Sequence, residues 1–170
     1  MRRTPLFEVR SWAEVRRLAE HVAATTLVVD VEPSLQRWGA TDPVDVDAAI
    51  RTVLDGTDGV RRLLLVTNSP LRCSGPVSRR TGALSTEFLG SARKPFTPLT
   101  RLPRTDGPVL VVGDQVLTDG LLAVRLGAVF GFWPATGQVP LWPRLQTALA
   151  RPLLRLVFGL RTVPRQETDT

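Results

Sequence analysis

The sequence is poor in several residue types, and each shortage excludes a class of protein. Cys73 is the only cysteine among the 170 residues, so no disulfide can form within the chain, and a reducing, cytoplasmic compartment is expected. No uninterrupted apolar run approaches the roughly 18–20 residues that a membrane-spanning helix needs. Residues 1–10 are basic but contain no apolar segment, which argues against a secretory signal peptide.

Lysine is as scarce as cysteine. The chain has 22 basic residues, and Lys94 is the only one of them that is not arginine. The compact lysine ammonium and the planar arginine guanidinium are not interchangeable chemically, which draws attention to this position. The net charge of +6 indicates an acidic partner, such as a phosphorylated substrate or an anionic lipid. Because the arginines are spread along the chain, biased codon usage is an equally good explanation of the charge.

The composition is otherwise that of an ordinary soluble domain. Hydrophobic residues make up 43% of the chain and charged residues 22%, and a chain of this length can bury a core without disulfides or metals. We expect residues 1–161 to form a single domain and residues 162–170 to form a polar C-terminal tail.

Short apolar runs alternate with amphipathic stretches along the chain. The expected strands are 26–31, 61–67, 86–89, 109–112 and 128–132, and the expected helices are 11–24, 45–54 and 118–126. The first helix begins with the capping-box spacing of Ser11 and Glu14. Prolines and glycines leave residues 70–82 ambiguous. The alternation predicts an α/β fold, a three-layer Rossmann-like arrangement with a parallel sheet of about five strands.

Polar residues follow the ends of four of these strands, where ligands bind in such sheets. They are Asp30 and Glu32, Thr67 and Asn68, Lys94, and Asp114. A single aspartate after a strand is most often a turn or helix cap. Four strand ends that bring carboxylates, a hydroxyl and an ammonium to one edge favour a functional site instead.

These residue types suit phosphoryl transfer through a covalent intermediate. Asp30 can act as the nucleophile, and a magnesium ion is needed between its charge and that of a phosphate dianion. Thr67 can donate to phosphate oxygens, while Lys94 neutralises the charge of the attacked group. Glu32, two positions after the nucleophile, is placed to protonate the leaving group and later to activate water.

Four segments resemble the motifs of the haloacid dehalogenase (HAD) superfamily. They are Asp30–Leu35, Val66–Asn68, Ala92–Pro95 and Gly113–Asp119. The chain is most similar to the capless YqeG branch, which includes phosphatidylglycerophosphate phosphatases. The features shared with that branch are Trp38, Gln115, Thr118 and the segment 125–127, and the resemblance extends from about Trp12 to Arg161.

The resemblance implies a role for each matching residue. Asp30 would be the nucleophile, and Asp114 would be a magnesium ligand. Asp119 would be a second acid that ligates or orients around the metal and the lysine. The backbone carbonyl of residue 32 would also face the metal. The expected metal site therefore comprises Asp30, Glu32, Asp114 and Asp119, and the expected phosphate site comprises Thr67, Asn68 and Lys94. The implied fold has no cap domain.

The chain departs from the family pattern at three positions. The family pattern has Asp at the position of Glu32 and Asn at the position of Pro33. It usually has Asn at the position of Val124. The extra methylene of Glu32 moves its carboxylate by about an ångström, a shift that can cost ~100-fold in rate. Two other interpretations therefore stay open beside the active phosphatase: a pseudoenzyme that binds phosphate or phospholipid without turnover, and a basic module that docks on membrane or protein.

The segment 140–161 carries apolar residues at helical spacing together with four arginines. Such a surface can lie on an anionic membrane, which would place the protein peripherally at the inner face of that membrane. The alternative is a helix that packs on the sheet and is interrupted at Pro152. A phosphorylated small molecule or a phospholipid is the expected partner. Nucleic acid is not expected as a partner, because the only feature that favours it is the net positive charge and the sequence contains no nucleic-acid-binding motif.

Overall fold

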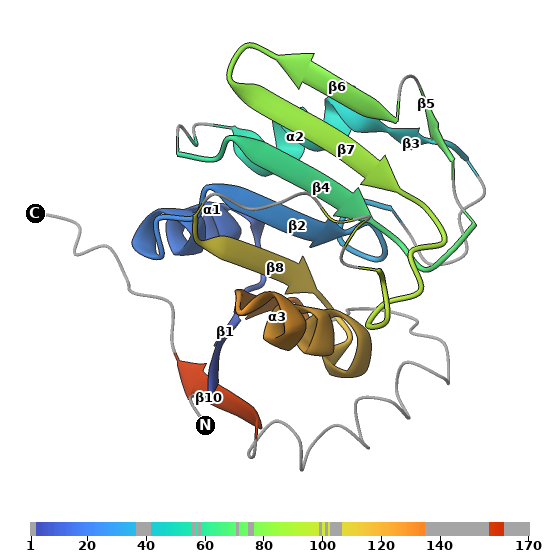
Figure 1. Cartoon of the computed structure of the whole chain (residues 1–170). Coiled ribbons are helices and arrows are strands. Elements are labelled where there is room, and N and C mark those ends of the chain that lie inside the picture. The colour runs from blue at the N-terminus through green and yellow to red at the C-terminus, as the bar shows by residue number, and fades with distance from the viewer. Residues whose placement is uncertain are drawn as a thin grey trace, which may run out of the picture.

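The computed structural model describes residues 3–36, 42–55, 57, 59–70, 72–74, 77–98, 100, 102, 107–134 and 157–161. The strands of the main sheet are β1 (Thr4–Glu8), β2 (Thr26–Asp30), β4 (Arg62–Val66), β6 (Ser78–Thr81), β7 (Leu84–Leu89), β8 (Val109–Gly113), β9 (Val129–Phe132) and β10 (Phe158–Arg161). They form an eight-stranded sheet in the order β10-β1-β9-β8-β2-β4-β7-β6 (Figure 1). All neighbouring pairs are parallel except β6 and β7. The short strands β3 (Val44–Asp45) and β5 (Cys73–Ser74) pair separately.

Helices cover both faces of the sheet. The helices α1 (Trp12–His21) and α2 (Val46–Leu54) lie on one face. A π-helical turn, η2 (Val116–Gly120), leads into α3 (Leu121–Leu126) on the other face (Figure 1). The fold is therefore α/β with a mostly parallel sheet between helices, as the alternating sequence pattern predicted.

Two apolar clusters, one on each side of the sheet, hold the layers together. Successive residues of β2 alternate between them: Leu27 and Val29 pack in the cluster that contains Leu18 of α1, and Val28 packs in the one that contains Leu122 of α3. Burial of each such side chain contributes about 1.5–3 kcal/mol. A central strand buried on both faces explains why β2 has no polar residue before Asp30 except its first, Thr26.

The helix ends follow their sequence signals. The Ser11 hydroxyl accepts a hydrogen bond from the Glu14 backbone at the start of α1, as the capping-box spacing predicted. Asp45 caps α2 in the same way through the amide of Ala48. Gly127, in the left-handed region at φ 62°, ends α3.

The expected count of about five strands is wrong, because the main sheet has eight. All five predicted strands are present, but β1, β6 and β10 were not predicted. Strand β1 contains Pro5, and proline is rare inside strands, so the sequence does not indicate a strand there. The pairing of β1 with β9 begins at Leu6, after this proline. Every residue of β6 is exposed and polar, so it lacks the apolar alternation that identifies a strand.

Within the segment 140–161, strand β10 corrects the helical interpretation for residues 158–161. Its residues Phe158–Arg161 pair in parallel with β1, and Phe158 is buried against the ring of Phe130. Residues 140–156 lie outside the described residues, as does the tail 162–170, so the single-domain, capless organisation stays a prediction. Among the described residues, no helix has both the length and the apolar character needed to cross a bilayer.

Candidate active site

The carboxyl ends of the central strands converge at one edge of the sheet. Asp30 ends β2, which lies between β4 and β8. Thr67 directly follows β4, and Asp114 directly follows β8. All three side chains are buried, although they are polar. The parallel strands therefore bring Thr67 and Asp114 close to Asp30, although they lie 37 and 84 positions after it in the sequence.

Lys94 lies at the centre of this group. Its Nζ is 2.6 Å from Asp30 Oδ2 and 2.6 Å from Asp119 Oδ1, and its side chain is only 2% exposed. The backbone of Lys94 is fixed by Asn68, whose Oδ1 accepts from the Lys94 amide at 2.6 Å and whose Nδ2 donates to the Lys94 carbonyl at 3.3 Å. Asn68, predicted as a phosphate ligand, thus also positions the lysine loop in this structure.

Asp119 reaches the lysine from the π-helical turn η2. The Gln115 amide donates to Asp119 Oδ2 at 3.1 Å, which orients the carboxylate. The close approach requires glycine at position 113, because a Cβ there would lie 2.4 Å from Asp119 Cγ. Such π-helical turns within helices often occur at functional sites. Gly113 belongs to the segment 113–119, which resembles a family motif. Its packing against Asp119 explains why this position needs a glycine.

Asp30, Asp114 and Asp119 form a compact carboxylate cluster. One oxygen of each lies within 4.8 Å of the others. If all three carboxyl groups were ionised, the single ammonium of Lys94 would leave two negative charges without balance in a buried place. In addition, Asp114 Oδ1 is buried and has no hydrogen-bond partner. A divalent cation bound by these oxygens would balance the charge and satisfy the orphaned atom, so the donor set fits a hard ion such as magnesium.

The lack of positive charge is reflected in the pKa values of the metal-free site. Burial, followed by repulsion from Asp119, raises the pKa of Asp114 to about 8. The same two causes raise the pKa of Asp30 well above its ordinary value, although the attraction of Lys94 acts in the opposite direction. For Lys94, burial alone would lower the pKa, but attraction by Asp119 and Asp30 outweighs it and raises the pKa. The lysine is therefore charged at neutral pH.

Glu32 faces a different set of groups from the three aspartates. Its Oε2 accepts hydrogen bonds from the hydroxyls of Thr67, at 3.3 Å, and Ser69. It is not one of the three residues whose oxygens form the compact carboxylate cluster. Thr67, predicted to bind phosphate, donates to Glu32 in this arrangement. Sequence reasoning missed Ser69, because a serine in a loop carries no signal of its own before its neighbours are known.

The pKa of Asp114 predicts how the stability of the metal-free protein depends on pH. The pKa of Asp114 is about 8 in the folded protein, above its ordinary value of 3.8. Between about pH 4 and pH 8 the folded protein therefore keeps a proton on Asp114, whereas the unfolded chain has released it. The free energy of unfolding should therefore fall as the pH rises through this window. Urea unfolding with a chelator, at several pH values, measures this slope.

The variant Asp114→Asn supplies the comparison for this prediction. It keeps the size of the side chain but cannot ionise, so its unfolding free energy should fall less steeply over the same window. Identical slopes for the two proteins would show that Asp114 does not titrate in this range.

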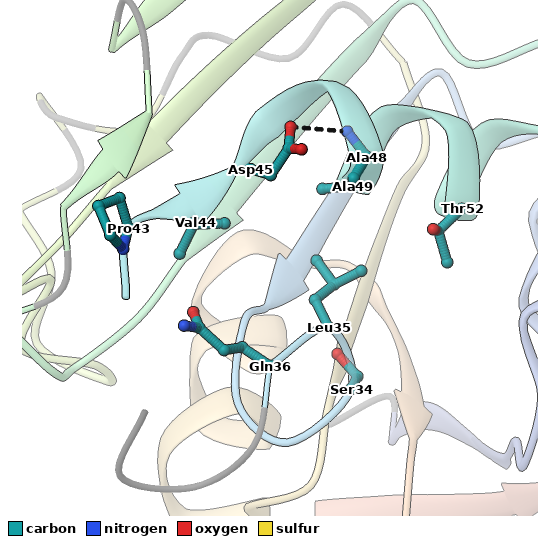
Figure 2. Close-up of a pocket in the computed structure, with 9 residues that line it drawn as sticks. All are labelled: Ser34, Leu35, Gln36, Pro43, Val44, Asp45, Ala48, Ala49 and Thr52. Carbon is teal, nitrogen blue, oxygen red and sulfur yellow. Dashed lines mark hydrogen bonds between the residues drawn. The ribbon is translucent and has the colours of Figure 1, made fainter. Parts of the chain in front are cut away.

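A separate hollow of about 270 Å³ lies between α2 and the loop that follows β2 (Figure 2). Its lining residues are Ser34, Leu35, Gln36, Pro43, Val44, Asp45, Ala48, Ala49 and Thr52. Val44 and Ala49 belong to the apolar cluster on the α1 and α2 side of the sheet, whereas α3 packs on the opposite side. Ser34 links the hollow to the site, because its hydroxyl donates to the Asp30 carbonyl at 2.6 Å.

The chain's single histidine, His21, and its single cysteine, Cys73, belong to elements that carry none of the site carboxylates. His21 ends α1, where its ring meets that of Phe7 edge to face, and Cys73 belongs to the short strand β5. Trp38 lies outside the described residues.

Comparison with known proteins finds no matching family model, no matching curated protein and no matching solved structure.

Proposed function

We propose that this protein is a magnesium-dependent phosphomonoester phosphatase that acts through an aspartyl-phosphate (acyl phosphate) intermediate on Asp30. The observation that carries the proposal is the buried group of Asp30, Asp114, Asp119 and Lys94, in which three crowded carboxyl groups share one ammonium and an oxygen of Asp114 is orphaned. A group of this kind is costly to bury unless an ion or a substrate completes it. Buried, perturbed carboxylates at the carboxyl edge of a parallel sheet are typical of catalytic sites.

The proposal includes a Rossmann-like fold of the HAD type. The order of the central strands supports it, since the nucleophile candidate ends the middle strand and the other site residues come from its neighbours on both sides. The sequence resemblance to the capless YqeG branch extends the proposal to substrates with a phospholipid head group, such as phosphatidylglycerophosphate. An open edge without a cap would admit a substrate of that size.

Asp114, Asp119 and Asp30 would hold the magnesium ion, whose charge screens the carboxylate nucleophile from the phosphate dianion. In the first step an oxygen of Asp30 attacks phosphorus, the bond to the leaving oxygen breaks, and the Glu32 carboxyl gives that oxygen its proton. In the second step Glu32 takes a proton from water as the water attacks phosphorus. The bond from phosphorus to Asp30 then breaks, and inorganic phosphate leaves.

Lys94 would contribute charge stabilisation throughout. Its ammonium already contacts Asp30 at 2.6 Å, and its buried position keeps water from screening it, so its charge acts strongly on the phosphoryl oxygens in the transition state. Asp119 orients the ammonium, and Asn68 fixes the backbone from which it extends.

Metal removal tests the proposal directly. Purified protein with magnesium should hydrolyse both a generic aryl phosphate and phosphatidylglycerophosphate, and excess chelator should reduce phosphate release to background, because charge screening at the three carboxylates is lost. Release of inorganic phosphate is the measurement, and restored magnesium should restore it. Magnesium-independent turnover would contradict the metal role. Binding of either substrate without turnover would identify a pseudoenzyme instead.

A further inference from the structure

The loop that follows β4 presents two hydroxyl groups to one oxygen of Glu32. Ser69 and Thr67 both donate to Glu32 Oε2, Thr67 at 3.3 Å. Glu32 is 3% exposed and Thr67 is 1% exposed, whereas Ser69 is half-buried, so this small network extends outward from the interior. The Ser69 backbone is also fixed, because its amide donates to Thr67 Oγ1 at 3.0 Å and its carbonyl accepts from Ser91 at 3.0 Å.

We propose that Ser69 is a positioning residue, which sets the orientation of the Glu32 carboxyl for proton transfer; the inference rests on the proposed phosphatase function. Both hydroxyls donate to Oε2, so the two contacts fix the direction of that oxygen. The Glu32 carboxyl is thereby held in one orientation, on the loop that starts at the nucleophile. Glutamate has one more rotatable bond than the aspartate of the family pattern. The hydrogen bond from Ser69 restricts rotation about that bond in Glu32.

The same contact has a consequence for Thr67. A hydroxyl has one proton to donate, so Thr67 cannot donate to Glu32 and to a phosphate oxygen at the same time. Ser69 supplies Glu32 with a second hydrogen bond. When phosphate arrives, Thr67 can then turn its proton to the phosphate without leaving the buried Glu32 oxygen unsatisfied, which would cost free energy.

The test compares two substrates that differ only in their need for an acid. An alkyl phosphate has a poor leaving group that must receive a proton, whereas a nitrophenyl phosphate has a good leaving group that leaves largely without one. We expect Ser69→Ala to lower kcat for the alkyl phosphate about 10- to 100-fold, and to lower kcat for nitrophenyl phosphate less than about threefold. Ser69→Thr, which keeps the hydroxyl, should recover most of the lost activity toward the alkyl substrate.

Two further variants keep the interpretation sharp. In a Glu32→Gln background, Ser69→Ala should have no additional effect on the alkyl substrate, because the two residues act as one unit. Ser85→Ala makes the same chemical change at the start of β7, away from the site, and should leave both rates unchanged.

The outcomes separate this inference from the function on which it rests. An equal loss on both substrates in Ser69→Ala, or an alkyl-specific loss that persists in Glu32→Gln, would overturn the positioning role while leaving the phosphatase function intact. A wild-type protein that hydrolyses neither substrate in magnesium would overturn the proposed function itself, and the role of Ser69 with it.

Discussion

Asp30→Asn should reduce magnesium-dependent phosphate release by roughly a thousandfold or more, to the level of the background. The amide is nearly the same size as the carboxylate, but it is a far weaker nucleophile and a poorer ligand for magnesium. The assay is the release of inorganic phosphate from aryl phosphate and from phosphatidylglycerophosphate at saturating magnesium. This is the largest effect that we expect on activity.

The fold should survive this substitution. Asp30→Asn replaces one of three crowded, buried carboxyl groups with an amide, and Lys94 keeps its 2.6 Å contact with Asp119. Its unfolding midpoint should therefore stay close to that of the wild type. Asp47→Asn makes the same change at an exposed position of α2 and should keep full turnover. If Asp30→Asn retained a tenth or more of the wild-type rate, Asp30 would not be the nucleophile.

Lys94→Met should destabilise the metal-free protein by about 3–5 kcal/mol and also abolish turnover. The substitution keeps an unbranched chain but removes the ammonium that contacts both Asp30 and Asp119. It leaves these two buried carboxyl groups without their ion-pair partner, and breaking a buried ion pair in this way is strongly destabilising. Chemical unfolding with a chelator measures the stability loss, and the phosphatase assay measures the loss of charge stabilisation.

Two comparisons isolate the cause of this effect. Arg93→Met removes a positive charge from the exposed neighbouring residue, and it should change stability by no more than about 0.5 kcal/mol. The double variant Lys94→Met with Asp119→Asn should recover part of the lost stability, because it removes one of the uncompensated charges, but it should not recover turnover. Equal stability of Lys94→Met and Arg93→Met would contradict the buried ion-pair network.

The alternation of apolar runs was enough to predict every strand of the central sheet that carries the site. Strands β2, β4 and β8 are short, buried and rich in aliphatic residues, whereas β7 and β9 are only partly buried. Apolar runs between helical stretches indicate a parallel sheet whatever the details of packing. The edge strands escaped prediction for local reasons. Strand β6 is polar on both faces, and the strand character of β10 depends on pairing with β1, which is about 150 residues away along the chain.

The sequence alone determined which polar residues lie at strand ends, and therefore which are brought to one edge of the sheet, because parallel strands all present their carboxyl ends there. Only the tertiary structure decided how they divide. It joins Lys94 to Asp30 and Asp119, leaves Asp114 with an orphaned oxygen, and turns Glu32 toward Thr67 and Ser69. Such contacts depend on side-chain direction over a few ångströms, which is set by packing and by local turns such as η2, and residue spacing does not encode them.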